Sequence, residues 1–470
     1  MMINFTGSYT DKYQLTMSQV YFLKGQQNTP AVFDYFFRRL PFNGGYAIFA
    51  GLEDLLNILV DLKFDKADLE YLKELGYHAD FINYLKDFRF RGNIYSSAEG
   101  DLVFPVRPVL QVEGTIIEAQ IIETLLLNIL NFQTLIATKA SRMRQASEGR
   151  ILIDFGLRRA HGPGGYYASR ASYIGGFNGT SNVRAGRDFD IPVSGTMAHS
   201  FIESYDDELS AFSDFAEVQP EECVLLVDTY DTLNSGLPNA IKIAKKMEEK
   251  GQRLNGIRLD SGDLSYLAKE SRKILDREGL SYVKIAVSNQ IDEYIIKSLL
   301  EQHAPIDLFG VGTSLVTGHP DGALDGVYKL SLANGKPRIK LSENISKITL
   351  PHRKQVFRIL DNENNFFGAD AVTLSDEKEP GMMHHPLYPL KSLSLLKYGK
   401  EPLLEKVMSN GTPVKKAGSL SEIADYSRSR MKQLPEEYKR FDNPHIYKVG
   451  ISKKLLSERD RLIDEIKKTI

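Results

Sequence analysis

The chain has little cysteine and almost no net charge. Its single cysteine, Cys223, excludes an intrachain disulfide framework and a cysteine-based zinc cluster, and it suits a reducing compartment. The formal net charge of −2 gives no reason to expect a surface for polyanions. We therefore expect no nucleic-acid partner, and any phosphate binding has to be local.

Long apolar runs are also missing. No stretch approaches the roughly 20 uninterrupted apolar residues that a membrane-spanning helix needs. The first residues, MMINFTGSYTDKY, lack the basic and apolar regions of a signal peptide. We expect no membrane partner and a cytoplasmic location. The 470 residues, 42% of them hydrophobic and 26% charged, are typical of a globular protein of two or three domains.

The first part of the chain mixes helical and strand-like patterns. The spacing of apolar residues predicts a strand over 31–37 and helices over 44–60, 69–88 and 117–140. The segment 102–112 contains two prolines and is typical of irregular or edge-strand chain.

From residue 151 onward, short apolar runs alternate with helical stretches. Each run ends in small or polar residues: ILIDFGLRR, YIGGFNGTSN, IPVSGTMAH, CVLLVDTYDT, NGIRLDSGD, VKIAVSNQ and IDLFGVGTS, with GVYKLSL after a glycine-rich gap. This alternation indicates βα units around a parallel sheet. Seven or eight such units in about 180 residues predict a compact, irregular α/β barrel with its chemistry at the strand ends. A doubly wound open sheet is the rival, and it would gather polar residues near one crossover.

The pattern predicts three parts. Residues 1–115 form an α+β domain, and residues 116–340 form the barrel that carries the active site. Residues 341–470 form a C-terminal segment that packs back on both. This last segment is more polar and less periodic, with terminal helices expected over 420–438 and 453–468.

Two strand ends carry candidate ligand-binding residues. Gly310 and Gly312 leave backbone N–H groups exposed before Thr313, which suits a phosphate, although tight strand-to-helix turns also use glycine for steric reasons alone. Arg258 and Asp260 lie two residues apart and so point to the same side of a strand. They fit ribose hydroxyls, or Mg²⁺ together with an anion, or simply a structural ion pair.

Further candidates are aromatic, acidic and imidazole side chains. Arg158 near Phe155 fits a flat anionic ring, or else a solvated arginine and a core phenylalanine. His199 has no second histidine or cysteine at a metal-ligand spacing, and the chain lacks the G-x-S-x-G elbow of serine hydrolases. A phosphorylatable histidine needs one ring nitrogen held, and the carboxylate of Asp228 is placed to hold it. A histidine that starts a helix remains the alternative.

Eight stretches occur in one order: TDKYQLTM, DFGLRRAHG, GTSNVRAG, GTMAHSF, LLVDTYDT, GIRLDSGDL, VSNQID and FGVGTS. Together they resemble nicotinate phosphoribosyltransferases, members of the type II phosphoribosyltransferases, over nearly the whole chain. The resemblance implies an incomplete α/β barrel that joins nicotinate and phosphoribosyl pyrophosphate into nicotinate mononucleotide and pyrophosphate, in NAD salvage. It also implies Mg²⁺, and ATP hydrolysis coupled through a phosphohistidine.

The resemblance implies a role for each matching residue. His199 would be the phosphohistidine, supported by Asp228. Nicotinate would contact Tyr13 of the neighbouring subunit in a homodimer, together with Phe155, Arg158, Asn182, Thr196 and Arg258. The phosphoribosyl group would contact Asp260, Ser288, Asn289, Gly312 and Thr313, with Asp260 also a candidate ligand of the substrate's Mg²⁺.

Asn182 bears on the choice of substrate. Nicotinamide-using relatives place an aspartate in their equivalent of GTSN, where this chain has Asn182. A carboxylate there would repel the carboxylate of nicotinate, whereas a neutral amide does not. Ser288 and Asn289 likewise depart from the Gly-Asp of those relatives, so nicotinate is the expected substrate. A nicotinamide phosphoribosyltransferase and a non-catalytic nucleotide-sensing protein on the same fold remain the alternatives.

Overall fold

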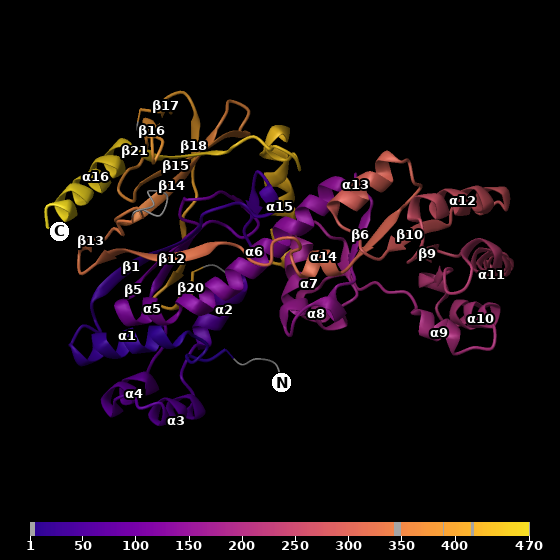
Figure 1. The fold of residues 1–470 in the computed structure, drawn as a ribbon, viewed down its shortest axis with the longest axis horizontal. Coiled ribbons are helices and arrows are strands. Elements are labelled where there is room, and N and C mark those ends of the chain that lie inside the picture. Colours follow the sequence, from indigo (N-terminus) through magenta and orange to yellow (C-terminus); the bar gives the residue numbers. More distant parts are fainter. Residues whose placement is uncertain (1–4, 343–348, 389, 415–417, 470) are drawn as a thin grey trace. The chain divides into compact units, whose positions relative to one another are not determined.

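The computed structural model describes residues 5–342, 349–388, 390–414 and 418–469 (Figure 1). The chain forms two compact units. The first contains residues 1–138 and 323–470, and the second contains residues 139–322. The boundary falls inside helix α6 (Glu123–Ala146), which contributes residues to both. The predicted three-part division stays a prediction, since these units group the first and last segments of the chain together.

An antiparallel sheet organises the first unit, in the order β13-β12-β1-β5-β3-β19-β20. Its strands are β1 (Pro30–Phe37), β3 (Asn93–Ser96), β5 (Leu110–Thr115), β12 (Gly326–Ala333), β13 (Lys336–Pro337), β19 (Glu405–Ser409) and β20 (Thr412–Pro413). The predicted strand over 31–37 is confirmed as β1. The expectation of irregular or edge-strand chain over 102–112 is wrong for residues 110–112. These residues belong to β5, which lies between β1 and β3 inside the sheet. Pro105 and Pro108 both precede β5, so the N–H groups that they lack are not needed for the hydrogen bonds of this strand.

Several helices of this unit begin or end at residues other than those predicted from the spacing of apolar residues. They are α1 (Lys12–Leu23), α2 (Leu52–Asp61), α3 (Lys66–Glu74), α4 (Ala79–Lys86), α5 (Ile116–Ile121) and α6. The helix predicted over 44–60 starts only at Leu52, after Gly51 at φ +97°. The helix predicted over 69–88 is two helices, broken near Gly76 at φ +82°, a conformation that favours glycine. The long helix over 117–140 is interrupted at Ile122.

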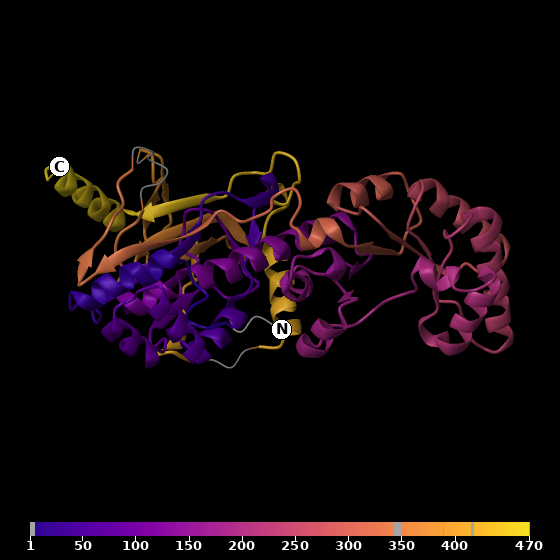
Figure 2. The same ribbon diagram turned by 60° about the horizontal axis from the view of Figure 1, so that its bottom comes forward.

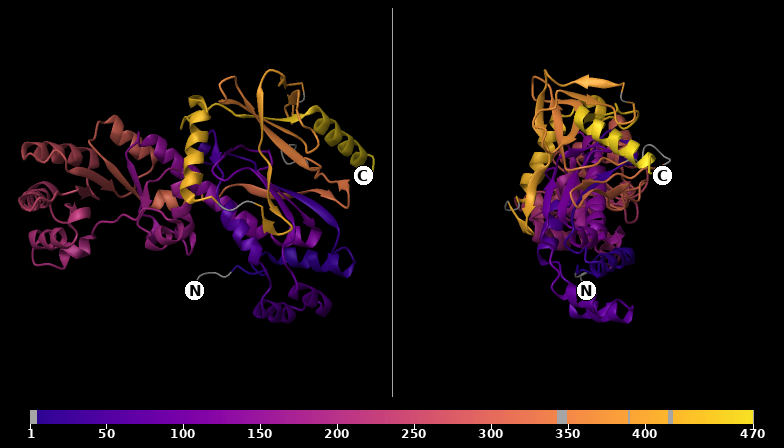
Figure 3. Two further views of the ribbon diagram at one scale, coloured as in Figure 1. Left: turned by 180° about the vertical axis from the view of Figure 1, so that it is seen from behind. Right: turned by 90° about the vertical axis from the view of Figure 1, so that its left-hand side faces the viewer.

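The C-terminal segment contains a second sheet that the weak periodicity did not predict. Its order is β17-β16-β21-β15-β14-β18. The strands are β14 (Lys354–Leu360), β15 (Phe366–Leu374), β16 (Met382–His384), β17 (Ser392–Ser394), β18 (Gly399–Pro402) and β21 (Lys448–Ser452). The two predicted terminal helices are present as α15 (Leu420–Gln433) and α16 (Lys453–Lys467), and α16 packs against β15, β16 and β21 (Figure 3).

A buried ion cluster joins the N-terminal and C-terminal segments of the first unit. Arg358 Nη1 lies 2.7 Å from Asp101 Oδ1, and Arg430 Nε lies 2.8 Å from the same oxygen. Arg107 Nε lies 2.8 Å from Asp370 Oδ2 with both side chains fully buried. Burial opposes ionisation of Asp101, but the guanidinium groups of Arg358 and Arg430 outweigh it and lower the pKa of Asp101. Removing one of these side chains would leave its buried partners with part of their charge uncompensated, although Arg358 also pairs with Asp370 and Arg430 also pairs with Glu401.

The second unit is built on a parallel sheet in the order β7-β6-β11-β10-β9-β8. Its strands are β6 (Ile151–Asp154), β7 (Gly179–Thr180), β8 (Val224–Leu226), β9 (Gly256–Leu259), β10 (Lys284–Ser288) and β11 (Leu308–Val311). Strands β8, β9, β10 and β11 lie side by side in chain order, and β11 also pairs with β6. The ring is open between β8 and the segment beyond β7, where Val193 makes a single bridge to Thr180. This is the incomplete α/β barrel that was expected.

Helices connect the strands and lie around their outside (Figure 1 and Figure 2). They are η2 (Leu157–Arg159), α7 (Gly164–Ile174), α8 (Val183–Phe189), α9 (His199–Glu203), α10 (Glu208–Val218), η3 (Pro220–Glu222), η4 (Thr232–Gly236), α11 (Leu237–Glu249), α12 (Leu264–Arg277), α13 (Glu293–Glu301) and α14 (Thr313–Val316). Strands β9, β10 and β11 are almost wholly buried, as strands of a parallel sheet covered on both faces are.

Two predicted barrel strands are absent from the barrel. IPVSGTMAH forms only the bridge at Val193 and is otherwise irregular up to α9. GVYKLSL is β12, which pairs antiparallel with β1 in the first unit. Its buried residues, Tyr328, Ser331 and Ala333, lie among half-buried ones without strict alternation, and only the pairing with β1 distinguishes it from a barrel strand. Among the described residues, no helix combines the length and the apolar character needed to cross a membrane.

Candidate active site

Arg258 links three segments at the carboxyl ends of the barrel strands. It is the third residue of β9 and is 9% exposed. Its Nε donates to Ser288 Oγ at 2.9 Å, at the end of β10. Its Nη1 donates to Thr196 Oγ1 at 2.9 Å. Its Nη2 donates to Asp260 Oδ1 at 3.0 Å. The predicted residues Thr196, Arg258, Asp260 and Ser288 therefore form one cluster. The orientation of the Arg258 guanidinium is set by these three side chains and by the carbonyl of Met197, to which Nη1 also donates at 3.3 Å.

Two carboxylates follow the neighbouring strands β8 and β9. Asp228 Oδ2 accepts from the backbone N–H of Asp260 at 2.7 Å and from Ser261 Oγ at 2.6 Å. The other oxygen of Asp228 is buried and has no hydrogen-bond partner among the described residues. The described residues hold no group of three or more histidine, cysteine or acidic side chains that would cage a metal. Mg²⁺ is usually held by one or two carboxylates plus substrate phosphates, and Asp228 and Asp260 fit that pattern.

His199 begins α9 and its side chain is 39% exposed. Its Nδ1 lies 3.1 Å from Thr229 Oγ1, and its Nε2 lies 3.9 Å from Asp260 Oδ2. The bonds of Asp228 run to Asp260 and Ser261, so the contact that holds His199 belongs to the next residue, Thr229. Thr229 was not predicted from the sequence as a site residue. The one feature that could have indicated it is its position in the run VDTYD, directly after Asp228.

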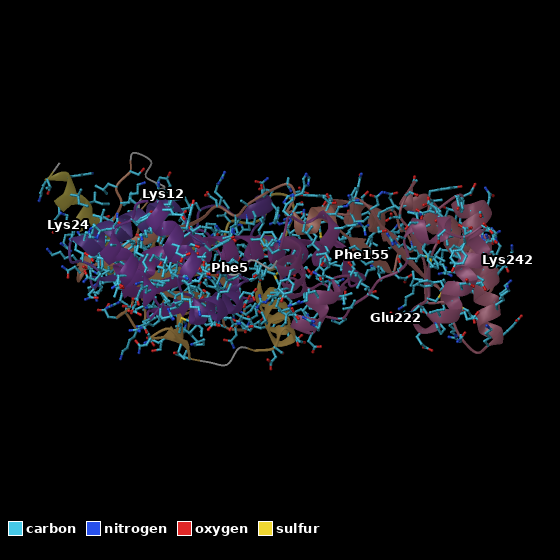
Figure 4. The ribbon with its side chains drawn as sticks, turned by 90° about the horizontal axis from the view of Figure 1, so that it is seen from below. Phe5, Lys12, Lys24, Phe155, Glu222 and Lys242 are labelled. Atoms are coloured by element: carbon cyan, nitrogen blue, oxygen red, sulfur yellow. The ribbon has the colours of Figure 1, made fainter. Side chains whose placement is uncertain are left out.

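Phe155, labelled in Figure 4, follows β6 and forms one wall of this cluster. The guanidinium carbon of Arg258 lies 5.5 Å from the centre of its ring, within the range of a cation–π contact. Gly310 lies against the same ring, since a Cβ added there would be 2.5 Å from two ring carbons. Glycine at 310 therefore has a steric reason. Gly312 and Thr313 follow at the end of β11, beside β6, where Thr313 opens α14.

Asn182 is buried and its side chain is committed to the fold. It is 2% exposed, and its Oδ1 accepts from the backbone N–H of Ala185, which caps α8. Its Nδ2 donates to Ser169 Oγ at 3.3 Å and to Gly165 O at 3.5 Å. Direct contact with a substrate would exchange these bonds, so the geometry favours a positioning role over the predicted contact.

Asp154, which sequence reasoning did not select, lies at the centre of the same network. It accepts from Ser169 Oγ at 2.7 Å, from Thr180 Oγ1 at 2.8 Å and from the N–H of Gly156 at 2.8 Å. Burial raises the pKa of Asp154, and these three bonds only partly offset the effect. The network ties the Phe155 turn to the segment of Asn182. An aspartate ending the apolar run ILID was its only sequence signal.

Three predicted residues stand outside these contacts. Arg158 is exposed on η2 with no partner among the described side chains. Asn289 follows β10 in the left-handed region, at φ +79°. Tyr13 belongs to the other unit, on α1, and is 51% exposed. The structure therefore gathers four of the predicted residues, Thr196, Arg258, Asp260 and Ser288, and the roles of these three others stay predictions.

The incomplete parallel α/β barrel of the second unit is that of the type II phosphoribosyltransferases. The crystal structure of human nicotinic acid phosphoribosyltransferase superposes with a TM-score of 0.87 at 31% identity, covering 96% of this chain and 99% of that one. That of nicotinate-nucleotide pyrophosphorylase from Pyrococcus furiosus gives 0.71 at 26% identity, covering 91% and 95%. Family models match the N-terminal domain (residues 9–131), the family region (151–377) and the C-terminal domain (353–458) of nicotinate phosphoribosyltransferase.

Relatives agree over nearly the full length. Nicotinate phosphoribosyltransferase of Bacillus subtilis is 45% identical, covering 98% of this chain and 96% of its own. That of Caenorhabditis elegans is 38% identical, covering 95% and 91%. The chain belongs to the nicotinate phosphoribosyltransferase family.

Proposed function

We propose that this protein transfers the phosphoribosyl group of phosphoribosyl pyrophosphate to nicotinate, giving nicotinate mononucleotide and pyrophosphate for NAD salvage. The observation that carries the proposal is the cluster in which Arg258 meets Thr196, Asp260 and Ser288 beside the ring of Phe155. A fixed guanidinium suits the carboxylate of nicotinate, and an aromatic face suits its pyridine ring. The relatives are named for the same reaction, which supports the proposal.

The chemistry follows from positioning and charge. Displacement of pyrophosphate at the anomeric carbon passes through an oxocarbenium-like state, and holding both reactants in line supplies much of the acceleration. Asp260 would bind ribose hydroxyls, and the backbone and hydroxyl groups at Gly312 and Thr313 would bind the 5′-phosphate. Asp228 and Asp260 would hold Mg²⁺ together with phosphoribosyl pyrophosphate, and the ion would supply positive charge beside its pyrophosphate group.

We also propose that ATP hydrolysis is coupled to transfer through phosphorylation of His199. The proximity of His199 Nε2 to Asp260 Oδ2, at 3.9 Å, supports this step. A phosphoryl group on His199 would place negative charge beside the proposed site of Mg²⁺ and pyrophosphate. That charge would change the affinity for the pyrophosphate substrate and favour departure of the product.

The active enzyme would be a cytoplasmic homodimer with Tyr13 of one subunit reaching the nicotinate site of the other. The 51% exposure of Tyr13 supports this assignment, because a tyrosine that serves a neighbouring subunit has to be accessible in its own. Equilibrium sedimentation would test the dimer, and a mixture of Tyr13→Ala and Arg258→Ala proteins would test the sharing. Recovery of activity on mixing two inactive variants is the expected result, and no recovery would contradict it.

The reaction is tested with purified protein, nicotinate, phosphoribosyl pyrophosphate and Mg²⁺, with and without ATP. Formation of nicotinate mononucleotide is the expected result, together with phosphate release from ATP. Replacing nicotinate with nicotinamide separates the nicotinamide-using alternative. Nucleotide binding without turnover of either base would favour the non-catalytic alternative and overturn the proposal.

The phosphohistidine is tested separately. Incubation with ATP labelled at the γ-phosphate should yield a phosphoprotein that is stable in base and labile in acid. Absence of label from the wild-type protein, under conditions where it makes nicotinate mononucleotide, would remove the coupling and leave the transferase assignment intact.

A further inference from the structure

Two adjacent residues after β8 serve two different parts of the site. Asp228 holds the turn after β9 through the N–H of Asp260 and through Ser261 Oγ. Thr229 Oγ1 lies 3.1 Å from Nδ1 of His199. No other side-chain hydrogen bond holds the imidazole among the described residues. The orientation of the ring therefore depends on one hydroxyl group.

The identity of that partner decides which ring nitrogen is available. A neutral imidazole has one N–H donor and one acceptor nitrogen. With Nδ1 bonded to Thr229, the nitrogen left for chemistry is Nε2, and this atom faces Asp260 Oδ2 at 3.9 Å. If Nδ1 carries the proton and donates it to Thr229 Oγ1, Nε2 has a free electron pair.

We propose that Thr229 is a positioning residue that holds His199 with its proton on Nδ1, so that Nε2 accepts the phosphoryl group. The inference rests on the proposed ATP coupling. In this step the electron pair of Nε2 forms a bond to the γ-phosphorus of ATP. The bond from that phosphorus to the bridging oxygen breaks, and its electron pair leaves with ADP. The proton stays on Nδ1, bonded to Thr229, so no further reactant is needed.

Once His199 is phosphorylated, a hydroxyl group suits the position beside Nδ1 better than a carboxylate. Phosphorylation on Nε2 leaves the ring cationic, and a carboxylate partner would stabilise that cation and with it the phosphohistidine. A neutral hydroxyl accepts the same hydrogen bond without adding a full negative charge. The phosphohistidine is then more easily hydrolysed than it would be beside a carboxylate, and hydrolysis has to occur in every turnover.

The test compares Thr229→Val with Thr229→Ser. Valine keeps the branched shape and removes the hydroxyl, whereas serine keeps the hydroxyl and removes a methyl group. We expect the single-turnover rate of labelling of His199 by γ-labelled ATP to fall about tenfold or more in the valine variant, and to stay within about threefold of wild type in the serine variant. Should the valine protein fail to fold, Thr229→Ala takes its place in the same comparison.

A second readout separates positioning from a purely structural role. Alkaline hydrolysis of the labelled wild-type protein should release histidine phosphorylated on Nε2. Phosphorylation on Nδ1, equal labelling rates in the valine and wild-type proteins, or failure of serine to restore the rate would each overturn the inference. Failure of the coupling itself gives a different result, because the wild-type protein would then take up no label at all.

Discussion

Gly310→Ala tests whether the placement of the Phe155 ring matters for catalysis. The added Cβ would lie 2.5 Å from ring atoms Cδ2 and Cε2, whereas carbon atoms pack at about 3.5–4.0 Å. The ring therefore has to move by about 1 Å, at a cost of about 1–3 kcal/mol in stability. A displacement of that size can reduce catalysis by about 100-fold, because the reacting groups are no longer aligned.

The assay measures kcat/KM for nicotinate with phosphoribosyl pyrophosphate saturating. We expect a higher KM for nicotinate, since the ring is proposed to contact that substrate, together with a lower kcat, since the bound substrate is misaligned. Gly322→Ala is the matched control, because a Cβ at Gly322 in the same unit meets no atom within 4 Å. A Gly310→Ala protein that is folded and has kcat/KM within about threefold of wild type would refute the reasoning.

Three further changes test other parts of the molecule. Asn182→Asp adds a carboxylate to the network of Asp154, so selectivity for nicotinate over nicotinamide should fall; an unchanged ratio of kcat/KM values would remove the argument from charge repulsion. His199→Ala should abolish stimulation by ATP, measured as the ratio of rates with and without it, while His161→Ala, an exposed histidine outside the cluster, keeps that ratio; equal ratios in the His199 variant and wild type would sink the phosphohistidine. Asp101→Asn should cost about 3 kcal/mol in the free energy of unfolding at pH 7, because it removes the buried carboxylate that Arg358 and Arg430 share and leaves each with one acidic partner, Asp370 or Glu401. The pKa of Asp101 is lowered in the folded state, so its stabilisation is present above the ordinary value of 3.8 and lost as pH falls further; denaturant titrations in which the difference between Asp101→Asn and wild type does not narrow in acid would contradict this.

Local patterns located most elements but misplaced several boundaries. The strand over 31–37 and the terminal helices follow from apolar spacing, and the structure has them. The helix predicted over 69–88 was wrong because its apolar spacing continues across Gly76, where the backbone turns left-handed. GVYKLSL has the same local features as a barrel strand, and only pairing with β1 assigns it to the other unit. Pairing between distant segments leaves no local signal.

In the candidate site, too, the residue types were predicted from the sequence but the contacts between them were not. The residue types at the strand ends, Arg258, Asp260 and Ser288 among them, were predicted from the order of the apolar runs and from the family resemblance, and the structure brings them into hydrogen-bond contact. Which atoms meet was not predictable. The sequence alone gave no reason to prefer Thr229 over Asp228 as the partner of His199.

The amino-acid sequence was sufficient to indicate the family, through the resemblance of eight short motifs, and the α/β class, through the alternation of apolar runs with helical stretches. The three-dimensional contacts assigned partners: Thr229 to His199, Asp154 to Ser169 and Thr180, and Gly310 to Phe155. The physical reason is that a hydrogen bond or a steric contact acts over a few ångströms. Such distances between segments far apart in the chain are set only when the barrel strands have paired.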